Sequence, residues 1–255
     1  LDFLGKDVYA RTIIGKEDFS INPLDRVYEE QSTQVDFAIT ILRLLEIHSN
    51  QIQERALLDY CLSNLYRTKD NPNMSDLYEE ISLYLSGKRE DSTVFEVGSN
   101  LMLAISAYLS GSRKSVFGER TTVDFSLSPV VNVFDISNLP EQNIGSNLRK
   151  AYLLIILAHI NRAIKVRRER GDYAPILFFV DEFGILIRDK EAAAFVSAMY
   201  KTARSRLVGM IVADQDLHSL LGPQDETGLH HGVPILANSA NQFVFRQKDS
   251  ELDNI

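Results

Sequence analysis

The chain has 255 residues, of which 45% are hydrophobic and 24% are charged, and this composition excludes disordered, collagen-like and disulfide-scaffolded proteins. A net charge of -8 argues against a general nucleic-acid coat, although a local basic patch can still contact DNA. The single cysteine, Cys61, allows no internal disulfide and indicates a reducing compartment. The longest apolar run, 151–158, is far shorter than a membrane span, and no signal peptide is visible, so we expect no integral membrane segment.

The first 111 residues divide into a turn-rich start and a helical block. Residues 1–30 are mixed, and Ile21-Asn22-Pro23-Leu24 predicts an extended segment that enters a loop. Residues 33–111 are predicted to be helical, and Thr93 and Glu96 form the capping-box pattern for the last helix. The helical spacing of apolar side chains is carried by Phe37, Ile41, Leu44, Leu45, Leu58, Cys61, Leu62 and Leu65.

From residue 130 onward, short apolar strands alternate with helices. Strands are expected over 131–135, 176–180, 207–213 and 242–246, and helices over 147–170 and 191–206. Strands that are apolar on both faces and joined by helical crossovers predict an α/β fold, with a parallel sheet covered by helices on both faces. Ligands of such sheets bind at the carboxyl ends of the strands.

Two strands end in the Walker B pattern, in which an acidic residue follows four hydrophobic ones. The first ends at Asp135, and its Asp-x-Ser sequence is typical of ordinary turn chemistry. The second ends in a doubled acid, Asp181-Glu182. One carboxylate of such a pair can hold Mg²⁺, and the next can polarise the attacking water as a general base. We therefore expect Asp181 to be the Mg²⁺ ligand and Glu182 the base.

An arginine and a glutamine complete this set of candidate residues. Arg204 ends the helix predicted over 191–206, and Gln215 follows the next strand. An arginine can offset charge that develops on a γ-phosphate, and a glutamine can sense that phosphate or orient water. We expect the last turn of this helix to emerge at the ligand edge of the sheet. The alternative is that Arg204 and its basic neighbours only complement the carboxyl end of the helix.

Together these segments resemble the ATPase domain of conjugative-transfer and type IV secretion ATPases, which belong to the HerA/FtsK superfamily of RecA-like hexameric motors. The matching segments are Ile21-Asn22-Pro23-Leu24-Asp25, Phe134-Asp135-Ile136-Ser137, Val180-Asp181-Glu182-Phe183-Gly184, Lys201-Thr202-Ala203-Arg204-Ser205-Arg206, Ala213-Asp214-Gln215-Asp216-Leu217, Ile235-Leu236-Ala237-Asn238-Ser239 and Phe243-Val244-Phe245-Arg246-Gln247.

The resemblance implies a RecA-like core over 1–32 and 112–255, with an all-α insertion over 33–111. It implies ATP and Mg²⁺ as cofactors, catalytic roles for Glu182, Arg204 and Gln215, and cofactor binding by Asp181, Arg246 and Gln247. In the family, the arginine reaches the nucleotide of a neighbouring subunit. The implied partners are further copies of the chain in a hexamer or other homo-oligomer, and components of the secretion or conjugation machinery at the inner face of the membrane. The implied location is cytoplasmic, peripheral to the cytoplasmic membrane, and DNA is a further candidate partner.

The sequence departs from the family pattern in two places. Asp214 precedes Gln215 where the family usually has a small hydroxyl residue. In addition, no Gly-Lys pair is followed by Ser or Thr, so the phosphate-binding P-loop pattern is absent. In the family this loop precedes the Asn-Pro-Leu segment. The chain opens with Leu1, and we expect it to be a fragment whose P-loop lies at or before its start, so that the fragment alone is inactive.

Other functions remain open at this point. A DNA-pumping coupling protein or a HerA/FtsK-type translocase fits the same motifs, and would need basic residues that face a pore. The strongest basic cluster comprises Arg162, Lys165, Arg167, Arg168 and Arg170, which also end a long helix where cations are expected. A non-hydrolysing assembly module is the competitor from another class, because the P-loop pattern is missing.

Overall fold

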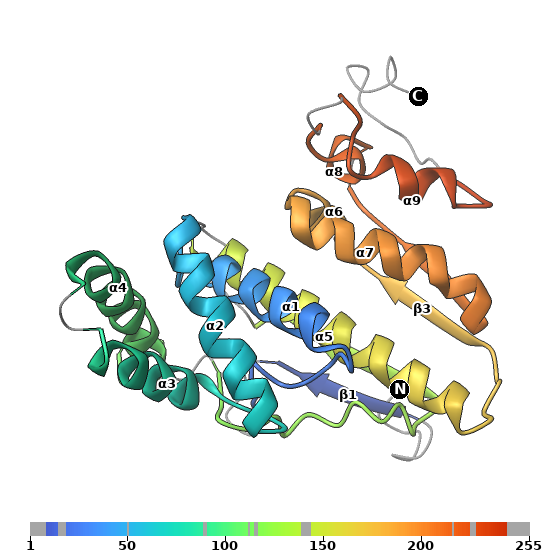
Figure 1. Cartoon of the computed structure of the whole chain (residues 1–255). Coiled ribbons are helices and arrows are strands. Elements are labelled where there is room, and N and C mark those ends of the chain that lie inside the picture. The colour runs from blue at the N-terminus through green and yellow to red at the C-terminus, as the bar shows by residue number, and fades with distance from the viewer. Residues whose placement is uncertain are drawn as a thin grey trace. The chain divides into compact units, whose positions relative to one another are not determined.

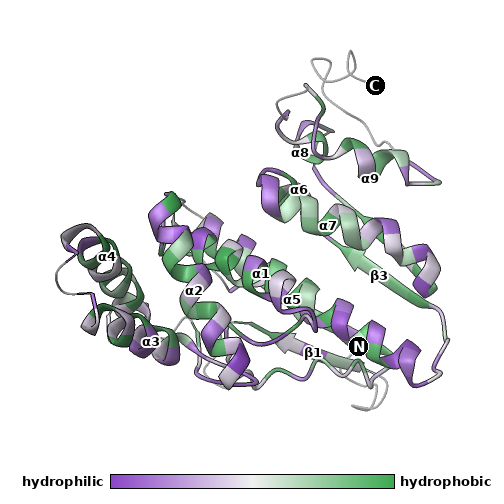
Figure 2. Ribbon diagram, in the orientation of Figure 1, coloured by the Kyte–Doolittle hydropathy of each residue, from purple (hydrophilic) through white to green (hydrophobic). Residues whose placement is uncertain are grey.

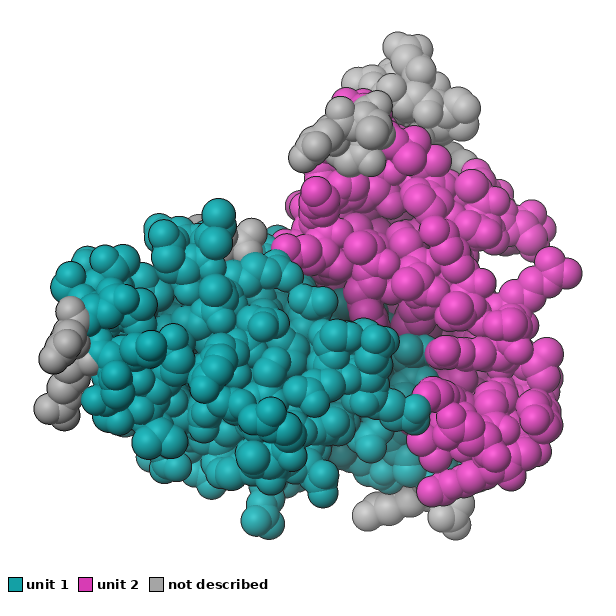
Figure 3. Space-filling model, in the orientation of Figure 1, with its two compact units in different colours: residues 1–162 teal, residues 163–255 magenta. Residues whose placement is uncertain are grey.

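The computed structural model describes residues 9–14, 19–49, 51–88, 91–111, 113–114, 117–138, 144–215, 217–224 and 228–243. The chain forms two compact units, residues 1–162 and residues 163–255 (Figure 3). The boundary between them falls within one long helix, α5 (Ile144–Glu169).

Four helices follow one another in the first unit: α1 (Gln31–Leu44), α2 (Ile52–Thr68), α3 (Met74–Ser86) and α4 (Ser92–Leu109). Each packs against the next along the chain, and α2 also packs against α4 (Figure 1). The predicted helical block is therefore confirmed, whereas its status as an insertion stays a prediction. Its fully buried side chains include Leu42, Leu58, Leu62, Leu77, Ile81, Leu101 and Ile105.

The start of α4 differs from the prediction. Its N-cap is Asp91, whose carboxylate accepts a hydrogen bond from the N–H of Val94 at 3.2 Å. Thr93 lies inside the helix, so the predicted capping box is wrong, because an acceptor two residues earlier takes its role. A capping box does occur at α3, where Asn73 and Asp76 each accept from the backbone N–H of the other.

A parallel strand pair in the first unit joins β1 (Tyr9–Ile13) to β2 (Val131–Asp135). Arg11 Nη2 donates to Asp135 Oδ2 at 2.5 Å, and Asp135 Oδ1 accepts from the N–H of Ser137 at 2.9 Å. These contacts hold the pKa of Asp135 at about 2, mainly through Ser137 and then Arg11. The interpretation of Asp135 as a turn residue is confirmed. β1 was not predicted.

The second unit holds the other parallel pair, β3 (Ile176–Val180) and β4 (Val208–Val212). Between them run α6 (Gly184–Ile187), α7 (Lys190–Ala203) and the 3₁₀ turn η1 (Arg204–Arg206). Two short helices, α8 (Leu217–Leu221) and α9 (Val233–Ala237), follow β4. The apolar stripe of α7 packs on β4 and buries Ala192, Ala193, Val196, Met199 and Ala203.

The described residues form two parallel pairs and not one continuous sheet. Figure 2 shows β3 as hydrophobic along its length, yet Leu177 is 72% and Phe179 is 59% exposed. Within the described residues, the face of this pair that carries Leu177 and Phe179 is exposed, in contrast to the predicted burial of both faces. Gln242 and Phe243 lie outside any strand, and the rest of the strand predicted over 242–246 falls outside the described residues. A full RecA-like sheet thus stays a prediction.

Candidate functional site

The carboxyl ends of β3 and β4 lie side by side, because Val180 pairs with Val212 in parallel register. Asp181 and Glu182 follow β3 directly, and Gln215 follows β4 after two residues. All three side chains are exposed. The structure therefore brings the predicted acid pair and the predicted glutamine to one edge of the strand pair, while their catalytic roles stay predictions.

The acid pair sits in a turn with an unusual backbone. Asp181 Oδ1 accepts a hydrogen bond from the N–H of Glu182 at 2.9 Å. Glu182 has a φ of 52°, in the left-handed region that side chains other than glycine seldom occupy. Such conformations are found where the surrounding structure holds a functional side chain in a required direction. The turn then enters α6, with the Glu182 carbonyl accepting from the N–H of Ile185 at 3.2 Å.

Asp214 links the two strand ends, a role that the sequence did not reveal. Its Oδ2 accepts a short hydrogen bond from the N–H of Gly184, and its Oδ1 accepts from the N–H of Gln215 at 2.7 Å. The backbone adds to this link, because the N–H of Phe183 donates to the Ala213 carbonyl at 3.1 Å. The departure from the family pattern at Asp214 is thus a structural tie between the acid turn and the glutamine turn.

Gly184 is required here for space. A Cβ at this position would overlap Asp214 Oδ2 and would lie 2.6 Å from the Cβ of Ser219 and 2.9 Å from its backbone carbonyl carbon. The Asp-Glu-Phe-Gly segment therefore ends in glycine because the Asp214 carboxylate and Ser219 of α8 occupy the space that a side chain would need.

The donor set suits a metal ion that arrives with a nucleotide. The described residues contain no group of three or more His, Cys, Asp or Glu side chains that could hold a metal ion on their own. Mg²⁺, however, commonly binds through one or two carboxylates together with water and phosphate oxygens. Asp181 is exposed and uses only Oδ1 in the hydrogen bond to Glu182. It fits as one protein ligand of a magnesium–nucleotide complex.

Arg204 lies at the opposite edge of the strand pair, so the prediction that it emerges at the ligand edge is wrong. It belongs to η1, and its carbonyl accepts from the N–H of Leu207 at 3.1 Å. The carbonyl of Leu207 in turn accepts a hydrogen bond from the N–H of Ile176, which is the first residue of β3. A crossover helix between parallel strands runs antiparallel to them, so its end returns to where strands begin. Five-residue strands separate the two edges by about 13 Å.

Two further candidate residues cannot be placed. Arg246 and Gln247, expected to bind the nucleotide, lie outside the described residues. Their roles stay predictions.

The basic cluster at the end of α5 contacts its own unit. Lys165 Nζ lies 3.6 Å from Glu169 Oε1, and Arg167 Nη2 lies 2.6 Å from Asp172 Oδ2. Arg168 donates from Nε to the Arg206 carbonyl at 2.8 Å. Three of the five cations thus have partners within the second unit, and this gives them a structural role.

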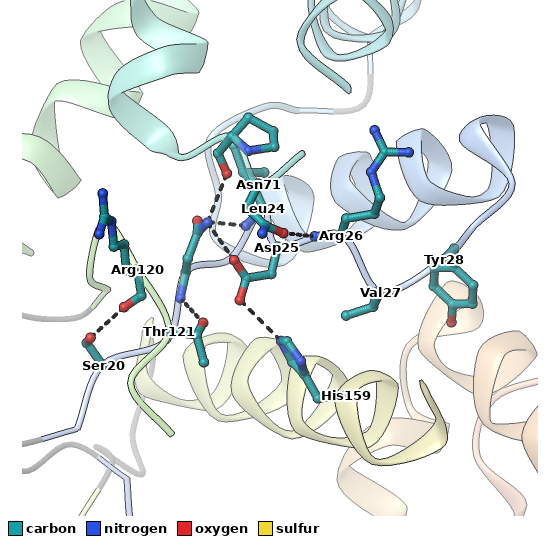
Figure 4. A network of polar contacts seen from close by, with 12 residues as sticks. Ser20, Leu24, Asp25, Arg26, Val27, Tyr28, Asn71, Arg120, Thr121 and His159 are labelled. Atoms are coloured by element: carbon teal, nitrogen blue, oxygen red, sulfur yellow. Dashed lines mark hydrogen bonds and ion pairs between the residues drawn. The ribbon is translucent and has the colours of Figure 1, made fainter. Parts of the chain in front are cut away.

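The Asn-Pro-Leu-Asp segment is the centre of a buried polar network in the first unit (Figure 4). Asn22 is 1% exposed, and its Nδ2 donates to Asp25 Oδ1 at 2.8 Å and to the Pro72 carbonyl at 2.9 Å. Its own N–H donates to Thr121 Oγ1 at 2.8 Å. One asparagine therefore joins the loop after β1 to the α2–α3 connection and to the segment that leads into β2.

Asp25 faces His159 of α5 at the edge of this network. His159 Nε2 lies 3.6 Å from Asp25 Oδ2, and the imidazole ring stacks on Phe125 with centroids 4.4 Å apart. Burial raises the pKa of Asp25, against the lowering effect of hydrogen bonds from Thr121 and Asn22. Burial, assisted by Arg162, lowers the pKa of His159 to about 4. The histidine is thus a buried neutral side chain at pH 7.

Comparison with solved structures shows which known fold the chain shares. The chain superposes on the structure of VirB4 of Thermoanaerobacter pseudethanolicus with a TM-score of 0.76 and 18% sequence identity, covering 96% of this chain and 66% of that chain. No family model matches the sequence, and no curated protein matches it either. The chain therefore shares the VirB4 fold and spans about two thirds of that protein. Across the described residues, every helix is too short or too polar to cross a membrane.

Proposed function

We propose that this chain is the core of an ATPase that energises conjugative DNA transfer or type IV secretion. The main support for this proposal is that Asp181, Glu182 and Gln215 all follow the carboxyl ends of β3 and β4, at one edge of the strand pair. The fold, which is like that of VirB4, is the second support. In this proposal Asp181 holds Mg²⁺ with the ATP phosphates, Glu182 takes the proton of the attacking water, and Gln215 senses the γ-phosphate. The bound Mg²⁺ supplies charge neutralisation between the phosphates.

The proposal places the active protein in a homo-oligomer, most simply a hexamer, at the cytoplasmic face of the membrane. Its partners there are other components of the secretion machinery. Arg204 supports an oligomeric site, because the edge at which it lies is the one away from Asp181 and Glu182. An exposed arginine at that edge is suited to the nucleotide of a neighbouring subunit. The phosphate-binding loop belongs, in this proposal, to a longer protein that contains the chain.

The test uses the full-length protein. Glu182→Gln should retain binding of ATP with Mg²⁺ but lose hydrolysis, because binding depends on the metal and phosphate contacts whereas turnover depends on the base. Glu169→Gln is the matched control, since Glu169 is an exposed glutamate of the same unit that pairs with Lys165. A Glu182→Gln variant that hydrolyses ATP within a few-fold of the wild-type rate would refute the role of Glu182.

Mixing variants tests the oligomeric site. Arg204→Ala should lower turnover and leave nucleotide affinity nearly unchanged, and mixtures of Arg204→Ala with Glu182→Gln should regain activity. In such mixtures, one subunit supplies the base and its neighbour supplies the arginine. Failure to recover despite demonstrated exchange of subunits would exclude action across the interface.

A further inference from the structure

Arg168 joins two segments that are far apart in the sequence. From the last turns of α5, its Nε donates to the carbonyl of Arg206 in η1 at 2.8 Å, and its Nη1 donates to the carbonyl of Asp172 at 2.5 Å. A guanidinium can hold two carbonyl groups at once because its N–H groups form a rigid, planar fork. The turn that carries Arg204 is therefore fixed to the end of α5.

The segment on the α5 side of this bridge is itself well anchored. The carboxylate of Asp172 accepts from Arg167 Nε at 2.8 Å and from the N–H of Ala174 at 3.0 Å. The N–H of Asp172 also donates to the Arg167 carbonyl at 3.0 Å. Arg168 thus connects η1 to a rigid turn that leads directly into β3.

The η1 side is short and exposed. It is a three-residue 3₁₀ turn with no buried residue, and it ends at Leu207 with a φ of 55°. Further hydrogen bonds hold it through the Leu207 N–H to the Arg204 carbonyl, the Ile176 N–H to the Leu207 carbonyl, and the Ser205 hydroxyl to the Thr202 carbonyl. An arginine on such a turn keeps its direction only if the backbone beneath it is held, and a displacement of about 1 Å can cost two orders of magnitude in rate.

We propose that Arg168 is a positioning residue that holds η1 so that Arg204 can reach the nucleotide of the neighbouring subunit. This inference rests on the proposed function, in which Arg204 acts across the subunit interface. It assigns to one member of the basic cluster a role through the protein backbone, with no contact to DNA or to nucleotide.

The experiment compares Arg168→Met with Arg168→Lys in the full-length oligomer. Arg170→Met is the matched control, because it removes an exposed arginine two residues away. Arg168→Met should lower kcat by at least about tenfold, approaching the effect of Arg204→Ala, with KM for ATP within twofold of the wild-type value. The kcat of Arg168→Lys should lie between those of wild type and Arg168→Met, because a single ammonium group cannot hold both carbonyls in the same geometry. Arg170→Met should keep wild-type turnover.

Subunit mixing separates positioning of Arg204 from damage to the variant's own nucleotide site. Arg168→Met mixed with Glu182→Gln should regain activity, since the Glu182→Gln subunit offers a correctly held Arg204. Arg168→Met mixed with Arg204→Ala should stay inactive, since neither subunit offers one. Recovery in the second mixture would overturn the inference, because it would mean that Arg204 is still correctly held without Arg168.

Hydrogen exchange supplies a readout that needs no turnover. The amide of Leu207 should exchange faster in Arg168→Lys than in wild type, while amides of α7 stay unchanged. Unchanged exchange at Leu207, or an Arg168→Met kcat within twofold of wild type while Arg204→Ala is impaired, would refute positioning and leave the proposed function intact. Wild-type turnover by Arg204→Ala would instead refute the role of Arg204, and with it this inference.

Discussion

The carboxylate of Asp214 accepts a hydrogen bond from the backbone N–H of Gly184, and so ties the turn after β4 to the turn after β3. The same carboxylate accepts from the N–H of Gln215. One side chain thus sets the spacing between the acid pair and the glutamine. A small hydroxyl residue at this position could not bridge the turns with two acceptor oxygens.

Asp214→Asn should destabilise the protein, because an amide offers one acceptor oxygen where the carboxylate offers two. The expected loss is about 1–2 kcal/mol in the free energy of unfolding, measured by urea titration. Asp181→Asn is the control, since Asp181 makes a single local hydrogen bond to the next residue and should lose less than about 0.5 kcal/mol. Equal losses in the two variants would contradict a bridging role for Asp214.

Gly184→Ala should be strongly destabilising, because a methyl group has no space between Asp214 and Ser219. Overpacking of this kind costs about 1–3 kcal/mol, seen as a lower midpoint of urea unfolding. Gly209→Ala offers the contrast within β4. Its Cβ would lie 3.3 Å from the Cδ1 of Leu177, an exposed side chain that can move, and 4.0 Å from the carbonyl oxygen of Ile176, which is an ordinary contact distance. We expect Gly209→Ala to be neutral or slightly stabilising. If Gly184→Ala were equally harmless, the packing around Gly184 would be looser than described.

The buried Gln34 should be essential to the loop after β1. Its Oε1 accepts from the N–H groups of Val27 and Tyr28, and its Nε2 donates to the Asp25 carbonyl and to Tyr66 Oη. Gln34→Leu removes the hydrogen bonds to the Val27 and Tyr28 N–H groups and to the Asp25 carbonyl, while the Tyr66 hydroxyl keeps its bond to the Leu24 carbonyl. The variant should cost about 1–3 kcal/mol in the free energy of unfolding. Gln31→Leu, at an exposed position on the same helix, should cost less than about 1 kcal/mol. Comparable losses would show that the loop gains little from Gln34.

The lowered pKa of His159 should make the protein less stable in mild acid. The unfolded chain protonates this histidine below about pH 6.5, whereas the folded protein keeps it neutral until about pH 4. Protons therefore favour the unfolded state, and the free energy of unfolding falls as the pH drops from 6.5 to about 4, by about 2–3 kcal/mol in total. Asp25 acts in the opposite direction at the lower end, because its raised pKa lets the folded state take up a proton first.

Urea titrations of wild type and His159→Gln at pH 7, 5.5 and 4 measure this effect. The stability advantage of wild type over the variant should shrink as the pH falls, because glutamine does not titrate. His218→Gln, which removes an exposed histidine, is measured beside it as the control for loss of a histidine. Parallel profiles for wild type and His159→Gln would mean that His159 titrates alike in the folded and unfolded states.

Helices and strands are predicted best from the sequence where their hydrophobic pattern is long or contains no polar residue. The unbroken apolar run of β3 and the apolar stripe of α7 identified both elements, and parallel pairing then brought Asp181 and Gln215 together. β1 was missed because its five residues, Tyr-Ala-Arg-Thr-Ile, mix polar and apolar side chains. Its pairing with β2 depends on residues far away in the chain, which local patterns do not contain.

The site details that were missed depend on tertiary distances. The bridging carboxylate of Asp214 and the fork of Arg168 each join residues from separate elements. Arg204 is a different case, since its edge follows from chain direction alone. A helix that connects two parallel strands must end where the second strand starts, so the sequence already contained the correct placement.

The pairing of β1 with β2 also has a consequence for synthesis on the ribosome. Arg11 and Asp135, which fasten the two strands together, are 124 positions apart in the chain. At about 5–20 residues per second, β1 leaves the ribosome roughly ten seconds before its partner exists. The helices α1–α4 are made in that interval and have partners among themselves, so they can fold first. Until β2 has been made, β1 has no strand to pair with. A chaperone that shields the first residues of β1 during this interval would raise the yield of folded protein.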